Sequence, residues 1–235
     1  RSRQHVHSFA DSGRERARLY AAAKGAPVEF VGYTEDATEG QITDILGADA
    51  SVEQLDAGQP GEVVLNRTSF YGESGGQVGD IGSIRTETGV FRVDDTQRPT
   101  PHLVVHRGAV VEGFLAVGQD AMAQIDIERR DAIRRNHTAT HVLHRALRMV
   151  LGDETHQAGS LVAPDRLRFD FTSAQPLGAD GIQRVSEISN EVLLGDLEVQ
   201  SDTLPYAEAV EKGAMALFGE KYGDLVRMIS IGDYS

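Results

Sequence analysis

The chain opens with a polar segment in which helix-forming residues predominate. Arg, Ala, Gln and Glu are common over the first 25 residues, and β-branched side chains are few. This composition predicts a helix that runs to Ala23 and ends before Gly25 and Pro27.

From Val28 to Ile127 the pattern changes to short runs of β-branched residues separated by glycines. Regular short strands of this kind favour a small β-barrel. The expected strands are Ile42–Leu46, Glu62–Thr68, Gly89–Val93, Leu103–His106 and Ala121–Ile127.

Apolar residues then recur at helical spacing from Glu128 to Leu151, and Gly152 is well placed to end that helix. Strands and helices follow in turn, which predicts an α+β arrangement. The later strands are expected at Ser160–Val162, Leu167–Thr172, Glu198–Thr203 and Leu225–Ile231, and the later helices at Gly181–Leu194 and Tyr206–Lys212.

These patterns divide the chain into a helical tail (1–26), a β-barrel (27–127) and an α+β domain (128–235). A chain of 235 residues has room for two modest cores. The first residue is Arg1 and no signal segment follows it, so we expect a piece of a larger protein.

Composition narrows the chemistry. The absence of cysteine excludes disulfides and leaves His, Asp and Glu as the strong metal ligands of this sequence. A net charge of −13 argues against a protein that binds nucleic acid over its whole surface, so any RNA contact must be a local patch. No apolar run is long enough to cross a bilayer, and a cytoplasmic location is expected.

The segment from His137 to His141 has the spacing of a metal-ligand pair. Side chains at positions i and i+4 of a helix share one face, so two imidazoles can converge on one ion. A metalloprotease motif is excluded, because Thr138 stands where that motif has glutamate. Surface or core roles for two such histidines are also common, and zinc requires further ligands. His144 is one candidate third ligand, although a hydrogen-bonding role suits it better.

Three groups of motifs resemble aminoacyl-tRNA synthetases. The first resembles the editing domain shared by alanyl- and threonyl-tRNA synthetases, and the second resembles the barrel motif of alanyl-tRNA synthetases and their free-standing editing relatives. The third strengthens the alanyl assignment. The motifs are, in that order, Arg135–His144 with Gln157–Val162 and Leu167–Phe171; Ser69–Asp80; and Gly213–Gly223.

The resemblance implies a fragment of an alanyl-tRNA synthetase whose α+β domain is a two-layer α/β sandwich. It also implies zinc, held by His137, His141 and a Cys-x-x-x-His element expected after Gly232–Ser235. The fragment is thus expected to lack half of the metal site on which the implied activity depends. ATP and magnesium would belong to an aminoacylation region outside this chain. The expected partner is the tRNA specific for alanine, with no DNA or membrane partner.

The activity implied is hydrolysis of mischarged seryl- or glycyl-tRNA, within a parent enzyme that ligates alanine to tRNA. His137, His141 and Gln157 are then the catalytic candidates. The substrate pocket is expected to include Glu73, Ser74, Gly75, Gly76 and Gln77. Arg134, Arg145 and Arg148 lie near the direction of His141 on a helical wheel, and they are candidate RNA contacts.

Three alternatives stay open. A free-standing trans-editing deacylase would share the barrel turn and the histidine pair, but the helical residues 1–25 argue against it. In a non-catalytic tRNA-binding module the histidines would be structural. An origin in a threonyl-tRNA synthetase fits less well, because the barrel turn and Gly213–Gly223 are closer to alanyl enzymes.

Overall fold

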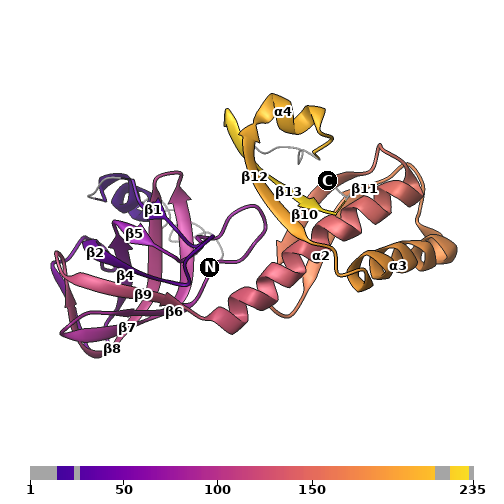
Figure 1. Ribbon diagram of the computed structural model, residues 1–235. Helices are drawn as coiled ribbons and strands as arrows, with labels where there is room; N and C mark the ends of the chain where they lie inside the picture. Colours follow the sequence, from indigo (N-terminus) through magenta and orange to yellow (C-terminus); the bar gives the residue numbers. More distant parts are fainter. Residues whose placement is uncertain (1–14, 24–26, 215–222, 233–235) are drawn as a thin grey trace, which may run out of the picture. The chain divides into compact units, whose positions relative to one another are not determined.

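The computed structural model describes residues 15–23, 27–214 and 223–232. The chain divides into two compact units, Arg1–Asp131 and Ala132–Ser235 (Figure 1). The Met215–Tyr222 part of the predicted alanyl motif lies outside the described residues, as do residues 1–14 of the predicted helix.

A closed antiparallel β-barrel forms most of the first unit. Its strands follow the order β8-β4-β2-β9-β6-β7, and a further pairing of β7 with β8 closes the ring. The six strands are β2 (Ala37–Leu46), β4 (Pro60–Leu65), β6 (Gly82–Arg85), β7 (Gly89–Thr100), β8 (Leu103–Ala116) and β9 (Asp120–Ile125). Three short strands complete the unit: β3 (Gln54–Asp56), which pairs with β8, and β1 (Glu29–Phe30), which pairs with β5 (Arg67–Thr68).

The barrel confirms the predicted class of the first region and changes some boundaries. β7 and β8 are longer than predicted: β7 continues through a polar segment to Thr100, and the two strands stay paired with each other across bulges from Gly89↔Gly113 to Thr100↔Leu103. β6 was not predicted, since four residues give too short an alternation to detect. The predicted strand Glu62–Thr68 is split at Asn66, which interrupts β4 and β5.

The barrel core contains a buried histidine. Phe70 and Phe91 are fully buried, and His106 lies edge-on to Phe70 with a ring-centroid distance of 5.1 Å. His106 Nδ1 donates to the carbonyl of Val63 at 2.8 Å, so Nε2 accepts from the Thr68 hydroxyl at 2.8 Å. Burial lowers the pKa of His106 to about 4 despite the opposing effect of the Val63 bond, and the imidazole is neutral at pH 7.

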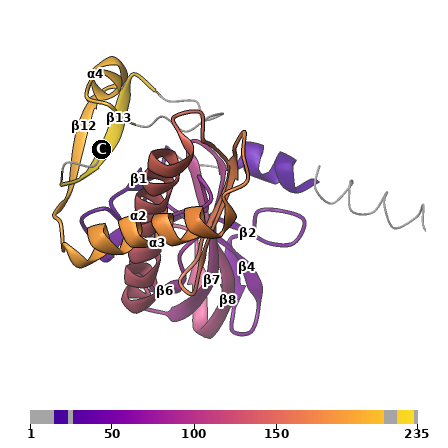
Figure 2. The same cartoon turned by 90° about the vertical axis from the view of Figure 1, so that its right-hand side faces the viewer.

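The described part of the N-terminal helix, residues 15–22, packs against the barrel (Figure 2). Tyr20 contacts a small apolar cluster that includes Leu46 and Val105. Arg16 forms an ion pair with Glu62 at 2.6 Å and donates to the carbonyl of Gly47 at 2.6 Å. Packing and charge therefore attach this helix to the barrel unit.

Helices and two separate two-stranded ladders make up the second unit. The helix predicted over Glu128–Leu151 is α2 (Ile127–Leu151), which crosses from the first unit into the second. The other elements are β10 (His156–Val162), β11 (Leu167–Thr172), α3 (Gly178–Leu194), β12 (Val199–Pro205), α4 (Tyr206–Glu211) and β13 (Leu225–Ile231). Within the described residues β10 pairs with β11 and β12 with β13, and the two ladders do not join.

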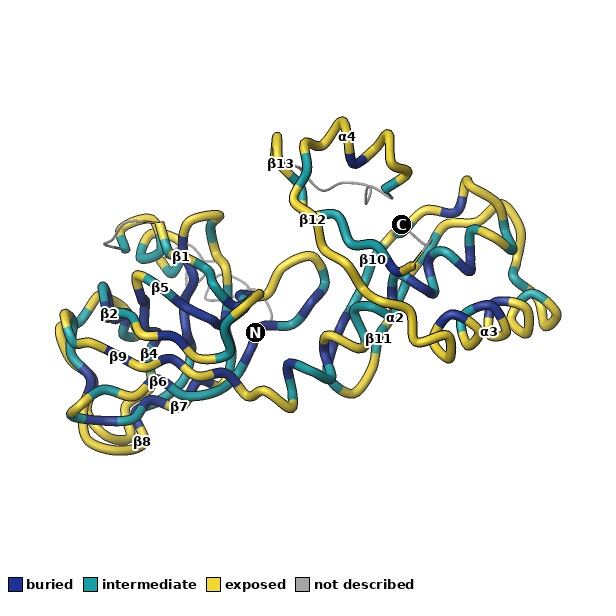
Figure 3. Tube along the Cα trace, viewed as in Figure 1, coloured by how far each residue is buried: buried dark blue, intermediate teal, exposed yellow. Residues whose placement is uncertain are grey.

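The α+β class of this unit is confirmed, although one continuous sheet layer is not present in the described residues. Ala146 and Leu147 of α2 form a buried cluster with Val185 and Ile188 of α3, and Phe169 of β11 packs against it. Figure 3 shows the buried positions of α2 and α3 recurring at helical spacing. Among the described helices, none is long and apolar enough to cross a membrane.

Candidate functional site

The start of α2 is fixed by a cap and a buried ion pair. The carboxylate of Asp126 accepts from the backbone N–H of Arg129 at 3.0 Å, which is the role of an N-cap aspartate. Arg130 is 4% exposed and pairs with Asp80, which is 1% exposed. The Arg130 guanidinium also donates to the carbonyls of Gly32 at 2.7 Å and Ser69 at 2.9 Å.

The sequence did not predict that Arg130 and Asp80 form a buried ion pair. An Arg in the first turn of a helix is normally solvated, so its residue type and position gave little indication of burial. Asp80 closes the Ser69–Asp80 motif, and its carboxylate also accepts from the Tyr71 backbone N–H at 2.7 Å. A buried carboxylate needs a cation and several hydrogen-bond donors to offset the loss of water, and Arg130 and the Tyr71 N–H supply them to Asp80.

His137 and His141 share one face of α2, as their spacing predicts. Their rings are stacked at a centroid distance of 5.2 Å and an interplanar angle of 9°. Burial lowers the pKa of His137, and Arg227 on β13 adds to the effect. Burial, followed by His137 and His144, lowers the pKa of His141 to about 4. Both imidazoles are therefore neutral at pH 7, the form that binds metals.

The two histidines are suitable zinc ligands, but two ligands are too few for a zinc site. Imidazole nitrogen is a preferred zinc ligand, but a site needs three or four ligands. No group of three His, Asp or Glu side chains in the described ranges is arranged to hold an ion. His144 is 6% exposed and packs on Phe169 at a centroid distance of 5.0 Å, so it is a core residue.

Two hydrogen bonds hold this part of α2 to the loop between β10 and β11. Asn136, directly before His137, donates from its side chain to the carbonyls of Ala163 at 2.7 Å and Pro164 at 3.3 Å. Within the helix, the Thr140 hydroxyl donates to the carbonyl of Asn136 at 2.8 Å. The histidine face is thus supported from the loop between β10 and β11.

Gln157 lies on β10 opposite Phe171, directly before a register shift at Gly159. Its side chain is half-buried and forms no hydrogen bond with the residues that the structure describes. The amide is consequently available to a ligand, although no contact joins it to the histidine pair.

The turn Glu73–Gln77 lies in the first unit, whereas the histidine pair and Gln157 lie in the second. Ser74 and Gln77 exchange backbone hydrogen bonds of 3.2 and 3.0 Å. Gly75 and Gly76 between them have φ values of 58° and 81°. Two positive φ angles in a two-residue loop are typical of a type I′ turn, which explains the glycines. Glu73, Ser74 and Gly75 are exposed.

The three candidate RNA-binding arginines have different surroundings. Arg134 is exposed. Arg148 pairs with Asp153 at 2.9 Å, as expected of a helix-surface arginine. The buried Nε atoms of Arg145 and Arg148 have no hydrogen-bond partner among the described residues.

The family of class II (A) tRNA synthetases matches residues 1–129, more than half of the sequence. The chain belongs to this family. It is also similar, along most of its length, to alanine–tRNA ligases. The relative from Acidothermus cellulolyticus is 50% identical over 223 residues, which is 94% of this chain and 25% of that protein.

Two further relatives agree. Alanine–tRNA ligase from Nitratidesulfovibrio vulgaris is 50% identical over 90% of this chain and 24% of its own length. The enzyme from Roseiflexus castenholzii is 49% identical over 92% of this chain and 24% of its own length. The chain thus spans about a quarter of the length of these curated relatives.

Proposed function

We propose that this chain is part of a cytoplasmic alanyl-tRNA synthetase and that its second unit contributes to a site that hydrolyses seryl- or glycyl-tRNA specific for alanine. The similarity to alanine–tRNA ligases supports the first statement. The second rests on one observation: His137 and His141 present two parallel, neutral imidazoles on one face of α2.

A second, hydrolytic site is needed because a site that activates alanine cannot reject glycine and serine completely. A pocket that accepts alanine also admits glycine, and a single added hydroxyl on serine gives limited discrimination. Ester hydrolysis at a second site removes the error. Water adds to the ester carbonyl, and the amino acid and the free 3′-terminal hydroxyl of the tRNA are released.

His137 and His141 would supply two ligands of a zinc ion, and the resemblance assigns the others to a Cys-x-x-x-His element that this sequence does not contain. When bound, zinc supplies a Lewis acid that can acidify water or orient the ester. The side-chain amide of Gln157 has no hydrogen-bond partner among the described residues, and it can orient water or substrate by hydrogen bonding.

The remaining assignments concern binding. Arg134, Arg145 and Arg148 are assigned to tRNA phosphates, because guanidinium groups bind phosphate strongly. The Glu73–Gln77 turn is assigned to the substrate. Alanine activation with ATP and magnesium belongs to the parent enzyme, outside this chain.

The test compares this chain with the same chain extended past Ser235 by the segment expected to carry Cys-x-x-x-His. Each is assayed for hydrolysis of seryl-tRNA specific for alanine, with and without added zinc. The decisive variant is His137→Ala. His102→Ala is the matched control, because His102 is exposed and belongs to the first unit.

We expect hydrolysis by the extended chain, and we expect His137→Ala to remove both activity and zinc while His102→Ala removes neither. An inactive extended chain that folds and still binds tRNA would overturn the hydrolytic assignment. It would favour a tRNA-binding module instead.

A further inference from the structure

Three aromatic side chains, Phe30, Tyr33 and Tyr71, form a cluster on the surface of the first unit, which we call the aromatic platform. Phe30 lies edge-on to Tyr33 at a ring-centroid distance of 4.9 Å and to Tyr71 at 6.0 Å. Tyr33 is 56% exposed, whereas Phe30 and Tyr71 are half-buried. The rings restrain one another, and more than half of Tyr33 stays accessible to a ligand.

The backbone that carries these rings is fixed by the buried pair of Arg130 and Asp80. The Arg130 guanidinium donates to the carbonyl of Gly32, directly before Tyr33, at 2.7 Å. The Asp80 carboxylate accepts from the backbone N–H of Tyr71 at 2.7 Å, and the Asp80 N–H donates back to the Tyr71 carbonyl at 3.0 Å. The aromatic platform is therefore pre-organised, so it loses little conformational freedom when it binds a ligand.

Two arginines border the aromatic platform. Arg98 packs against Gly72, the residue after Tyr71, where an added Cβ atom would lie 2.9 Å from the Cβ atom of Arg98. Arg129 donates to the carbonyl of Gly79 at 2.8 Å, on the returning side of the same loop. Both guanidinium groups are thus attached to the loop that carries Tyr71.

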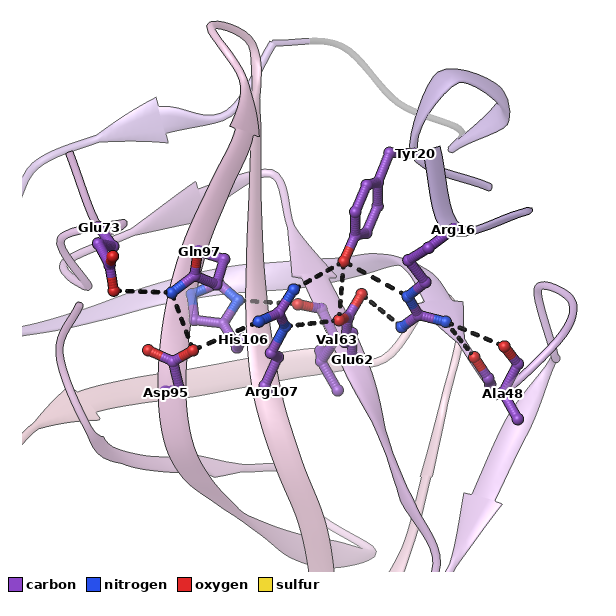
Figure 4. Close-up of polar contacts among 11 residues, drawn as sticks. Arg16, Tyr20, Ala48, Glu62, Val63, Glu73, Asp95, Gln97, His106 and Arg107 are labelled. Atoms are coloured by element: carbon purple, nitrogen blue, oxygen red, sulfur yellow. Dashed lines mark hydrogen bonds and ion pairs between the residues drawn. The ribbon is translucent and has the colours of Figure 1, made fainter. Parts of the chain in front are cut away.

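These two arginines differ in their charge environment from others of the same unit. Arg16 and Arg107 both pair with the carboxylate of Glu62 (Figure 4). Arg98 and Arg129 donate to backbone carbonyls, and within the described residues neither has a carboxylate within 4 Å. Their positive charges are therefore available to an anionic ligand, and guanidinium groups bind phosphate well.

The carboxylates on the same segments have partners of their own. Glu29 and Glu35 both pair with Arg67, at 3.4 and 2.6 Å. Glu73 accepts from the side-chain amide of Gln97 at 3.0 Å (Figure 4). None of these three carboxylates is within ion-pair distance of the two bordering arginines.

We propose that the aromatic platform binds an unpaired nucleotide of single-stranded RNA, with its base stacked on Tyr33 and its phosphates on Arg98 and Arg129. This inference rests on the proposed function, because the RNA would be the unpaired 3′ end of a tRNA. Proteins hold single strands by stacking bases on aromatic rings beside cationic side chains that bind the backbone. A duplex keeps its bases stacked on one another, so the platform should select single strands.

The test measures binding of the RNA tetranucleotide ACCA, labelled with fluorescein at its 5′ end, to the whole chain by fluorescence anisotropy. Two companion probes are the same sugar–phosphate strand with abasic sites and a blunt RNA duplex. The stacking variants are Tyr33→Ala, Tyr33→Leu and Tyr33→Phe, and the phosphate variant is Arg98→Gln.

Each kind of variant has a matched control on the same unit. Phe114→Ala removes an aromatic ring that is 37% exposed and lies outside the platform. Arg92→Gln removes an exposed arginine that already pairs with Asp94. Urea unfolding of every variant checks that the barrel is intact.

Tyr33→Ala and Tyr33→Leu should each weaken binding of the tetranucleotide about tenfold, which is typical of losing one base–aromatic stack, whereas Tyr33→Phe should bind as the native chain does. The abasic strand should bind the native chain as weakly as the tetranucleotide binds Tyr33→Ala. Arg98→Gln should reduce the slope of log affinity against log salt by about 0.7, the value for one phosphate contact with a single strand. Phe114→Ala and Arg92→Gln should change neither quantity.

Equal binding by the native chain and Tyr33→Ala, no binding of the tetranucleotide, or equal affinity for the duplex would overturn the proposal. An unchanged salt slope in Arg98→Gln would overturn the phosphate contact of Arg98. If the extended chain hydrolyses seryl-tRNA but the Tyr33 variants bind RNA normally, this inference fails and the proposed function stands. If the tetranucleotide binds as expected but the extended chain is inactive, the platform stands and the hydrolytic function fails.

Discussion

The two units bury their apolar residues to very different extents. The barrel closes on itself around one cluster in which Ile42, Phe70 and Phe91 are fully buried. The second unit has smaller clusters, and large apolar side chains stay exposed on it: Leu194 is 85%, Leu225 65% and Ile182 59% exposed. The barrel can support oriented polar groups by itself, whereas the histidine pair belongs to a unit with less buried apolar surface.

This comparison predicts two unfolding transitions, with the second unit unfolding first. Hydrophobic burial is the dominant favourable term in folding, and a domain with less of it is less stable. The following predictions are ordered from the largest expected effect to the smallest.

The largest effect is expected for Arg130→Met. The variant leaves the carboxylate of Asp80 buried without its cation, and breaking such a pair costs about 3–5 kcal/mol. The barrel transition in urea should shift by that amount. Arg92→Met is the control, because Arg92 and Asp94 form an exposed pair, and its effect should stay below about 0.5 kcal/mol. If Arg130→Met lowers the free energy of unfolding by less than about 1 kcal/mol, the Arg130–Asp80 pair does not stabilise the barrel as a buried ion pair should.

The second effect is the pH dependence of the barrel. The folded pKa of His106 is about 4, below its ordinary value of 6.5, so the unfolded chain takes up a proton first as the pH falls. The contribution of neutral His106 to the free energy of unfolding is fully present above pH 6.5, and about 3 kcal/mol of it should be lost between pH 6.5 and 4. His106→Gln should flatten this part of the urea-midpoint profile. An unchanged slope in the variant would rule out His106 as its source.

The sequence predicted most of the helices and strands but not the buried or long-range polar contacts between them. The strand Leu167–Thr172 and the helix ending at Leu194 were predictable because period-2 and helical patterns are strong there. The pairing of His137 with His141 followed from helix geometry alone. The links Arg130–Asp80 and Gln97–Glu73 join residues distant in sequence, and residue types do not identify such partners before the barrel has closed.

A moderate effect is expected for Leu147→Ala in the second unit. Leu147 is 2% exposed and borders an open groove that Leu143, Phe169 and Phe171 also line. Neighbouring side chains can close over the deletion, so the loss should be near the low end for such changes, about 2 kcal/mol. Only the first urea transition should move. A matching shift of the barrel transition would contradict the independence of the units.

The smallest effect concerns the turn. Gly75 has a φ of 58°, a conformation that Asn tolerates and β-branched residues resist. Gly75→Val should destabilise the barrel by about 1 kcal/mol more than Gly75→Asn. Thermal unfolding of the two variants side by side measures the difference. Equal melting temperatures would mean that the turn is not held in this conformation.

Zinc binding by the chain extended past Ser235 tests the central claim most directly. Competition with a chromogenic chelator at pH 7 gives the zinc affinity of that extended chain and of its His137→Ala, His141→Ala and His102→Ala variants. If His137 and His141 hold the ion together, either substitution should weaken binding at least tenfold, an effect typical of losing a metal contact, and His102→Ala should leave it unchanged. Equal affinities in all four proteins would show that the pair on α2 is not a metal site.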